Sequence, residues 1–227
     1  MKSRQNSDVL PSLVELKGKK VADIGCGDGS LTRLMTRHGA NVIGVECSKS
    51  QLASARAHKP AGNENYSEGL GEDLSFEDGN LDLVVFFNSL HHIAIDKQDK
   101  ALAEAARVLK TGGLVYICEP LAEGKHFELM QPVHDETAVR AAAIQAIGRA
   151  AKHGFSQELE TTYLHQASYP DYAAFRARIL AINPGLKDHF SDLQKILKNN
   201  FDSLGEKTDE AIQFGQPMRV NLLIKTA

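Results

Sequence analysis

The sequence predicts an α/β fold, in which a doubly wound, mainly parallel sheet of seven strands carries helices on both faces. Short apolar runs alternate with segments of helical spacing over the first 120 residues, and a glycine cluster ends the first run. The run at residues 81–87 is almost entirely apolar, which is typical of a strand covered on both faces. We therefore expect a single domain over residues 1–227, with a cofactor-binding half at 1–120.

The first half of the chain divides into alternating strands and helices. Strands are predicted at residues 21–24, 41–46, near 66, at 81–87 and at 114–118. Helices are predicted at 31–38, at 49–57 with Ser48 as the N-cap, and at 99–109, where Gly112 and Gly113 end the pattern. This order predicts parallel strands joined by crossover helices.

The second half has a different pattern. Helices are predicted at residues 137–152, 172–181 and 191–198, so that residues 121–200 form a helical insertion over the sheet, which we expect to act as a cover or lid. Residues 218–222 alternate between apolar and polar, and a partner strand is expected between residues 206 and 214. A terminal antiparallel hairpin at residues 206–225 would complete the sheet.

Composition excludes several classes of function. The chain has 26 basic and 29 acidic residues and no basic run of the kind that binds nucleic acid. No apolar segment reaches the length of a membrane span, so we expect a cytoplasmic protein without a membrane partner. The cysteines Cys26, Cys47 and Cys118 are widely spaced, which predicts reduced, mostly buried thiols and no metal site.

A glycine-rich turn follows the first predicted strand. Asp23, Gly25, Cys26, Gly27 and Gly29 form a DxGxGxG pattern where strand and helix meet. Glycines there let the backbone turn sharply and approach a ligand closely. The dinucleotide pattern GxGxxG would need a glycine at position 30, where this chain has serine. The spacing therefore favours S-adenosylmethionine over NAD, although a purely structural turn is an alternative.

Glu46 ends the second predicted strand about twenty residues after the first glycine of the turn. A carboxylate at this place can accept hydrogen bonds from both hydroxyls of an unmodified ribose. The alternative is a solvated strand end. With the first interpretation, Cys47 lies next to the adenine edge.

Three stretches resemble class I S-adenosylmethionine-dependent methyltransferases. They are VADIGCGDG at residues 21–29, GVE at 44–46 and GEDLSFEDGNLDLVVFFNSLHHI at 71–93. The resemblance implies roles for eight residues: the methionine part of the cofactor near Gly25, Cys26, Gly27 and Asn88, the ribose at Glu46, and the adenine beside Gly71, Glu72 and Asp73. Many relatives carry an aspartate before the position of Gly71, where this chain has Leu70.

Candidate catalytic residues follow the fourth and fifth predicted strands. His91 and His92 come after the fourth strand, and Glu119 ends the fifth. Ligands of doubly wound folds bind at this edge of the sheet, so one histidine can face the reacting methyl group as a base. A packing role for the histidines is the alternative, and Glu119 is the weaker candidate.

Together these features predict an S-adenosylmethionine-dependent methyltransferase that acts on a small molecule by direct displacement. The absence of an NPPY-like tetrapeptide after residue 87 argues against a flipped nucleobase as acceptor. Two alternatives remain at this stage: a non-catalytic protein that binds the cofactor, and an NAD-dependent oxidoreductase.

Overall fold

The structure, a computed structural model, describes residues 1–226. These residues form an eight-stranded sheet in the order β3-β2-β1-β4-β5-β8-β6, and a short β7 pairs with β8 outside this path. The strands are β1 (Lys20–Ile24), β2 (Asn41–Glu46), β3 (Asn65–Glu68), β4 (Leu81–Phe87), β5 (Leu109–Pro120), β6 (Phe155–Tyr169), β7 (Glu206–Lys207) and β8 (Ile212–Lys225).

Nine α-helices accompany the strands in the described part of the chain. They are α1 (Asn6–Leu13), α2 (Ser30–Arg37), α3 (Lys49–Ala57), α4 (Gln98–Val108), α5 (Lys125–Met130), α6 (Thr137–Gly148), α7 (Tyr172–Ile182), α8 (Lys187–Asp192) and α9 (Gln194–Leu204). Short 3-10 helices lie at Leu90–His92, Ile95–Lys97, Ala150–His153 and Pro184–Leu186. None of the helices within residues 1–226 is long and apolar enough to cross a membrane.

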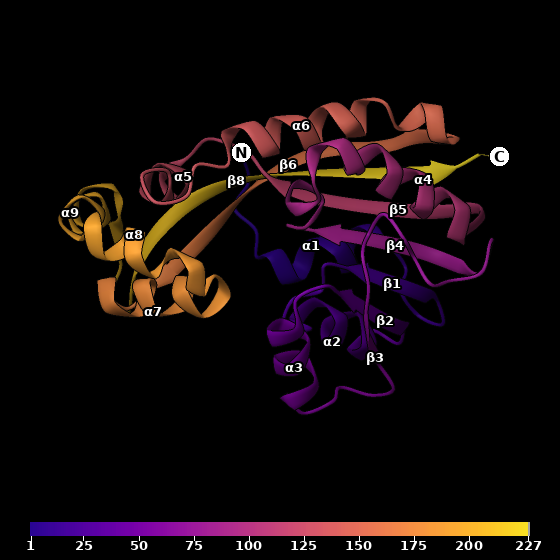
Figure 1. The fold of residues 1–227 in the computed structure, drawn as a ribbon, viewed down its shortest axis with the longest axis horizontal. Coiled ribbons are helices and arrows are strands. Elements are labelled where there is room, and N and C mark those ends of the chain that lie inside the picture. Colours follow the sequence, from indigo (N-terminus) through magenta and orange to yellow (C-terminus); the bar gives the residue numbers. More distant parts are fainter. Residues whose placement is uncertain (227) are drawn as a thin grey trace. The chain divides into compact units, whose positions relative to one another are not determined.

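The chain divides into two compact units. The sheet unit consists of residues 6–119, 141–161 and 219–226, and the helical unit consists of residues 1–5, 120–140 and 162–218. Figure 1 shows β3, β2, β1, β4 and β5 following one another across the sheet unit. All neighbouring pairs among these five strands are parallel, which confirms the predicted fold class.

The strand order explains where a ligand can bind in the sheet unit. From β1 the chain builds outward to β2 and β3, then returns to place β4 on the other side of β1. At such a reversal the crossover helices diverge to opposite faces, which opens a crevice at the carboxyl ends of the two central strands. Here these ends are Ile24 of β1 and Phe87 of β4.

Each unit has its own apolar core. The core of the sheet unit includes Val84 and Phe86 of β4 and Leu102 of α4, all buried. The helical unit has an aromatic core, in which the rings of Phe175, Phe190, Phe201 and Phe214 pack together with Tyr169. In Figure 1 helices α7, α8 and α9, in orange tones, gather at this core.

Two parts of the second-half prediction were wrong. The segment expected to be helical contains β6, a strand of 15 residues. The predicted terminal antiparallel hairpin is confirmed, since β7 pairs antiparallel with the start of β8, although β7 has only two residues and β8 begins at Ile212. The helix predicted at residues 191–198 is interrupted at Leu193, between α8 and α9. The role of residues 121–200 as a lid stays a prediction.

Candidate functional site

Every predicted site residue lies in the sheet unit, within residues 6–119. The glycine turn follows β1, Glu46 ends β2, and residues 88–92 follow β4. Glu119 lies near the end of β5, which pairs with β4 up to the pair of Phe87 and Cys118. The fold thus brings these groups to one edge of the sheet, at the carboxyl ends of β1 and β4.

The glycine turn is bound to β2 through its backbone. Gly25 N and Cys26 N both donate to Val45 O, at 2.8 and 3.1 Å. Gly25 has a φ of 69°, and a Cβ there would stand 2.6 Å from the Cβ of Ser89. Gly27 has a φ of 56°, but no atom of residues 1–226 lies within 4 Å of its Cβ position. Gly25 is therefore required by packing, whereas Gly27 faces open space.

The carboxylate of Glu46 connects the turn to the end of β2. Gly27 N donates to Oε2 at 2.9 Å, and Ser48 N donates to Oε1 at 2.8 Å. Ser48 also caps α3 as predicted, since its side chain accepts from Gln51 N. A carboxylate offers about four acceptor positions, so Glu46 keeps capacity for further donors such as ribose hydroxyls.

Asp23, at the end of β1, is buried and bound to α2. Thr32 Oγ1 donates to Asp23 Oδ2 at 2.6 Å. Burial, together with the charge of Glu46, raises the pKa of Asp23 to about 6, although the hydrogen bond from Thr32 opposes the shift. Asp23 therefore fixes the start of α2 against β1 while its charge destabilises the folded state at neutral pH.

Replacing Asp23 with asparagine is expected to stabilise the protein at about pH 8, by on the order of 3 kcal/mol. Below the unfolded-state pKa both states are protonated, whereas above about 6 the folded wild type must hold a buried charge. The wild type thus loses stability as pH rises through this window, and the variant does not. Urea unfolding of both proteins at about pH 5 and pH 8 measures the difference.

Asp82→Asn is the control, and its expected effect on stability at about pH 8 is opposite to that of Asp23→Asn. Burial works against its ionisation, but hydrogen bonds from Lys110 Nζ and Lys20 N hold the pKa of Asp82 below its usual value. Its removal should cost stability at about pH 8. A stabilisation by Asp23→Asn that is equal at both pH values would contradict the assigned charge effect.

The three cysteines are free. Cys26 and Cys118 are buried and Cys47 is exposed, in agreement with the prediction that the cysteines are mostly buried. Burial, with the nearby carboxylate charges, raises the pKa of the Cys26 and Cys47 thiols. Neither side chain is therefore a thiolate at neutral pH, and neither is a nucleophile in this state.

The loop after β3 contains the residues that the resemblance assigns to the adenine. Gly71 is buried, and a Cβ there would stand 2.7 Å from Ile93 Cδ1. Glu72 is half-buried and Asp73 is exposed, while Leu70 keeps 49% of its surface in contact with solvent. The aspartate that many relatives carry is thus replaced by an exposed apolar side chain.

Asn88 follows β4 in an unusual backbone conformation. Its φ of 53° lies in the left-handed region, where it stands alone among the non-glycine residues that the structure describes. Asn88 Oδ1 is buried and has no hydrogen-bond partner within residues 1–226. A buried acceptor without a donor is costly, and functional sites are where such groups and strained backbones gather. This observation fits a residue that awaits a donor from a ligand.

His91 is paired with Glu119. His91 Nδ1 and Glu119 Oε2 form a hydrogen bond between two residues that are 3% exposed each. The other carboxylate oxygen accepts from Leu90 N at 2.9 Å. Because Glu119 can only accept while ionised, it holds the His91 ring with the proton on Nδ1, which makes Nε2 the proton-accepting nitrogen.

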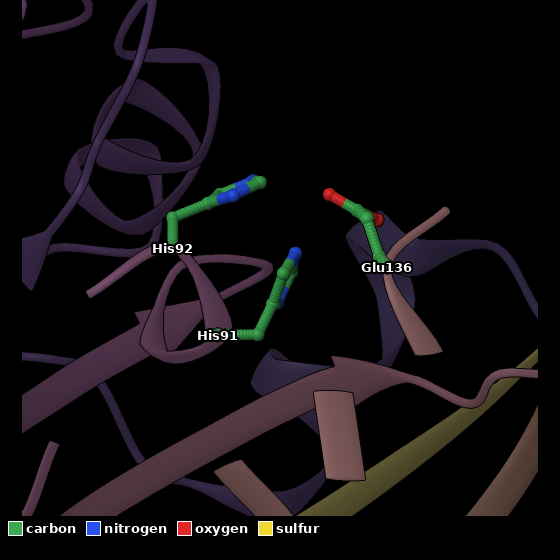
Figure 2. Close-up of side chains that lie close together, drawn as sticks. All are labelled: His91, His92 and Glu136. Atoms are coloured by element: carbon green, nitrogen blue, oxygen red, sulfur yellow. The ribbon is translucent and has the colours of Figure 1, made fainter. Parts of the chain in front are cut away.

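His92 lies beside His91 but is exposed. Figure 2 shows both rings on the turn after β4, and their centroids are 4.0 Å apart. Glu136, the third side chain of Figure 2, belongs to the helical unit, where its Oε2 accepts from Arg140 Nη2 at 2.6 Å. Glu119 thus orients the ring of His91.

Sequence reasoning missed two side chains that shape the turn. Thr32 donates to Asp23, and Ser89 Oγ donates to Ile24 O at 2.6 Å while its Cβ lies where it would clash with any Cβ at position 25. Neither residue belongs to a recognisable motif by itself. Their roles depend on the pairing of β1 with β4 and on the start of α2, which only the folded chain reveals.

Comparison with known proteins gives matches mainly over the first half of the chain. Residues 22–117 match the family model described as a methyltransferase domain. An uncharacterized methyltransferase of Synechocystis sp. (strain ATCC 27184 / PCC 6803 / Kazusa) is 35% identical over 105 residues, which are 46% of this chain and 49% of the relative. The ubiquinone biosynthesis O-methyltransferase of Pseudomonas aeruginosa is 34% identical over 105 residues, 45% of this chain and 44% of the relative.

The chain thus aligns with about half the length of these two relatives. Among solved structures, a protein from Bacillus halodurans C-125, provisionally described as a methyltransferase, has a TM-score of 0.66 at 19% identity, covering 98% of this chain and 99% of that one. At this level of identity the likeness concerns the fold. It extends over both units, beyond the segment that the family model matches.

Proposed function

We propose that this chain, whose residues 22–117 match the methyltransferase-domain model, is an S-adenosylmethionine-dependent methyltransferase acting on a small-molecule acceptor. The main observation behind this proposal is that Glu46, at the end of β2, accepts a hydrogen bond from Gly27 N in the glycine turn. This arrangement places an open backbone and a carboxylate next to each other, as a ligand with a ribose and a charged amino-acid part requires.

The residues present fit this cofactor. Gly27 leaves open space at the turn, Glu46 has spare acceptor capacity, and Asn88 Oδ1 lacks a donor among the described residues. We assign the methionine part to Gly25, Cys26, Gly27 and Asn88, the ribose to Glu46, and the adenine to Gly71, Glu72 and Asp73, with Cys47 at the adenine edge. We assign to Asp23 and Gly29 the role of shaping the backbone of the turn.

The bound cofactor would supply a methyl group on a sulfonium, which is already a good leaving group. The protein then needs to hold the acceptor in line with the carbon–sulfur bond and to exclude water. A base is needed only where the acceptor must lose a proton. In that case His91, oriented by Glu119, would take the proton on Nε2, and Glu119 would stabilise the resulting imidazolium.

Methyl transfer itself is tested with cofactor labelled in the methyl group. Incubation with a panel of small molecules that offer hydroxyl, amine, thiol or activated carbon acceptors should yield a labelled product. Oxygen acceptors come first in the panel, because one relative is named an O-methyltransferase of ubiquinone biosynthesis. Binding of the cofactor without any product would favour the non-catalytic alternative, and preferential binding of NAD would contradict the proposal.

Replacing Glu46 with alanine is expected to weaken binding of S-adenosylmethionine and S-adenosylhomocysteine by about tenfold to hundredfold. The variant loses the acceptor for ribose hydroxyls and also the bond to Gly27 N. Calorimetric titration measures both affinities. Glu68→Ala is the matched control, since Glu68 ends the neighbouring strand beside Glu46 but is exposed. Unchanged affinity in a folded Glu46 variant would remove Glu46 from the site.

A further inference from the structure

The loop that joins β3 to β4 contains the proposed adenine contacts but little regular structure. Residues 71–80 contain no helix or strand, and the turn at Gly71 is closed by Asp73 N donating to Leu70 O at 3.2 Å. A loop of this kind needs anchors outside itself if its backbone is to present a fixed surface to a planar base.

Arg107 of α4 provides such an anchor. Its Nη2 donates to Leu74 O at 2.8 Å, and its Nη1 donates to Phe76 O at 2.8 Å and to Asp78 Oδ1 at 2.7 Å. Gly79 N in turn donates to Arg107 O at 3.0 Å. A single side chain thus fixes three points of the loop, beginning directly after Asp73.

Glu104, one turn earlier on α4, holds the guanidinium in place. Arg107 Nε donates to Glu104 Oε1 and Nη2 to Glu104 Oε2, both at 2.8 Å. The same Oε2 accepts from Leu74 N at 2.9 Å. Leu74 is therefore bound through its N–H to the carboxylate and through its C=O to the guanidinium.

The chemistry of this arrangement is specific to arginine. A guanidinium is planar and carries five donors in a rigid fork, so it can bind a carboxylate and two carbonyls at once. Lysine has a single nitrogen and cannot reach these acceptors together. The hydrogen bonds from Arg107 keep the pKa of Glu104 below its usual value despite partial burial, so the pair remains charged at neutral pH.

We propose that Arg107, oriented by Glu104, is a positioning residue that fixes residues 71–73 for recognition of the adenine base. The inference rests on the proposed function, since it assumes that this loop binds the cofactor. A purely structural tie between α4 and the loop would stabilise the fold and would not affect how the protein distinguishes one base from another.

Base selectivity separates these two roles. The probes are S-adenosylhomocysteine and S-inosylhomocysteine, in which hypoxanthine replaces adenine and the exocyclic amino group is lost. Calorimetry on the full-length wild type should show about tenfold or greater preference for the adenine compound. In Arg107→Met the preference should fall to within about threefold, with a loss of at least about tenfold in affinity for S-adenosylhomocysteine. A partly unfolded variant would weaken both probes equally and leave their ratio unchanged.

Arg149→Met is the matched control. Arg149 also binds α4 through a carboxylate, with Nη2 donating to Asp99 Oδ2 at 2.5 Å, and its side chain is 37% exposed against 33% for Arg107. The side-chain hydrogen bonds of Arg149 go to Asp99, outside the loop. The Arg149→Met variant should keep the wild-type selectivity.

Arg107→Lys retains the charge and provides a second measurement if Arg107→Met fails to fold. Like Arg107→Met, it should lose selectivity.

The outcomes distinguish the inference from the proposed function. A wild type that binds neither probe contradicts the proposed function itself. Wild-type selectivity in a folded Arg107→Met or Arg107→Lys variant, equal loss in Arg149→Met, or a wild type that binds both probes equally overturns the positioning role alone.

Discussion

Replacing His91 with asparagine should reduce the rate of methyl transfer by about a hundredfold to ten-thousandfold while leaving cofactor affinity nearly unchanged, for an acceptor that must lose a proton. The reason is the pairing of His91 Nδ1 with Glu119, which fixes the tautomer and stabilises the protonated ring. Asparagine keeps a polar group of similar reach but cannot accept and release the proton. Single-turnover rates and calorimetric affinities with the same preparation separate the two effects.

His92→Asn is the control for this experiment, because the two rings are neighbours and it is His91 that pairs with Glu119. It should retain most of the turnover. Glu119→Gln should show a smaller loss than His91→Asn, since the amide can still accept a hydrogen bond but carries no charge to stabilise the imidazolium. Equal rates in His91→Asn and wild type would leave methyl transfer to positioning alone.

Replacing Gly27 with alanine should weaken binding of S-adenosylhomocysteine by about a hundredfold, the second large effect that we expect. The added methyl group would stand in space that no atom of residues 1–226 approaches within 4 Å, and the proposed methionine site occupies this space. The left-handed φ of 56° should cost about 1 kcal/mol of stability in addition. Calorimetry and urea unfolding measure the two quantities separately.

Gly18→Ala is the matched control for the Gly27 variant. Gly18 has a φ of 75° and also has no atom of the described residues within 4 Å of its Cβ position, but it precedes β1, at the other end of this strand. It should show the backbone cost and unchanged affinity. An equal loss of affinity in both variants, or no loss in Gly27→Ala, would mean that the cofactor does not approach the turn.

The sequence predicted the sheet unit better than the rest of the chain, and the reason lies in burial. Strands such as β2 and β4 have the predicted bounds, because a strand covered by helices must be apolar along most of its length. In contrast, β6 has exposed glutamine and glutamate side chains before Thr161, Thr162 and Tyr163, and it lies at the edge of the sheet. Its β-branched and aromatic residues were a signal for a strand, but one weaker than the helical pattern that precedes it.

The sequence predicted which residues belong to the candidate site, but only some of the contacts between them. The position of Glu46 at the end of a strand follows from hydrophobic patterning, and its place beside the glycine turn follows from parallel pairing of β1 with β2. The pair of His91 and Glu119 does not follow, since the two residues are 28 positions apart and their contact depends on side-chain rotamers. The same applies to Arg107, whose three loop contacts depend on how α4 lies against an irregular segment.

The division of the chain into units affects how this protein can be dissected genetically. All the proposed cofactor ligands lie before residue 120, yet the core that supports them also includes Ala143, Ala146, Phe155 and Leu223. A gene fragment that stops after β5 would therefore encode a complete set of binding groups on an incomplete core. The proposed cofactor-binding residues are continuous in sequence, but a fragment that contains only them lacks part of its core. Recombination at residue 120 would therefore separate the cofactor-binding residues from core residues that support their fold.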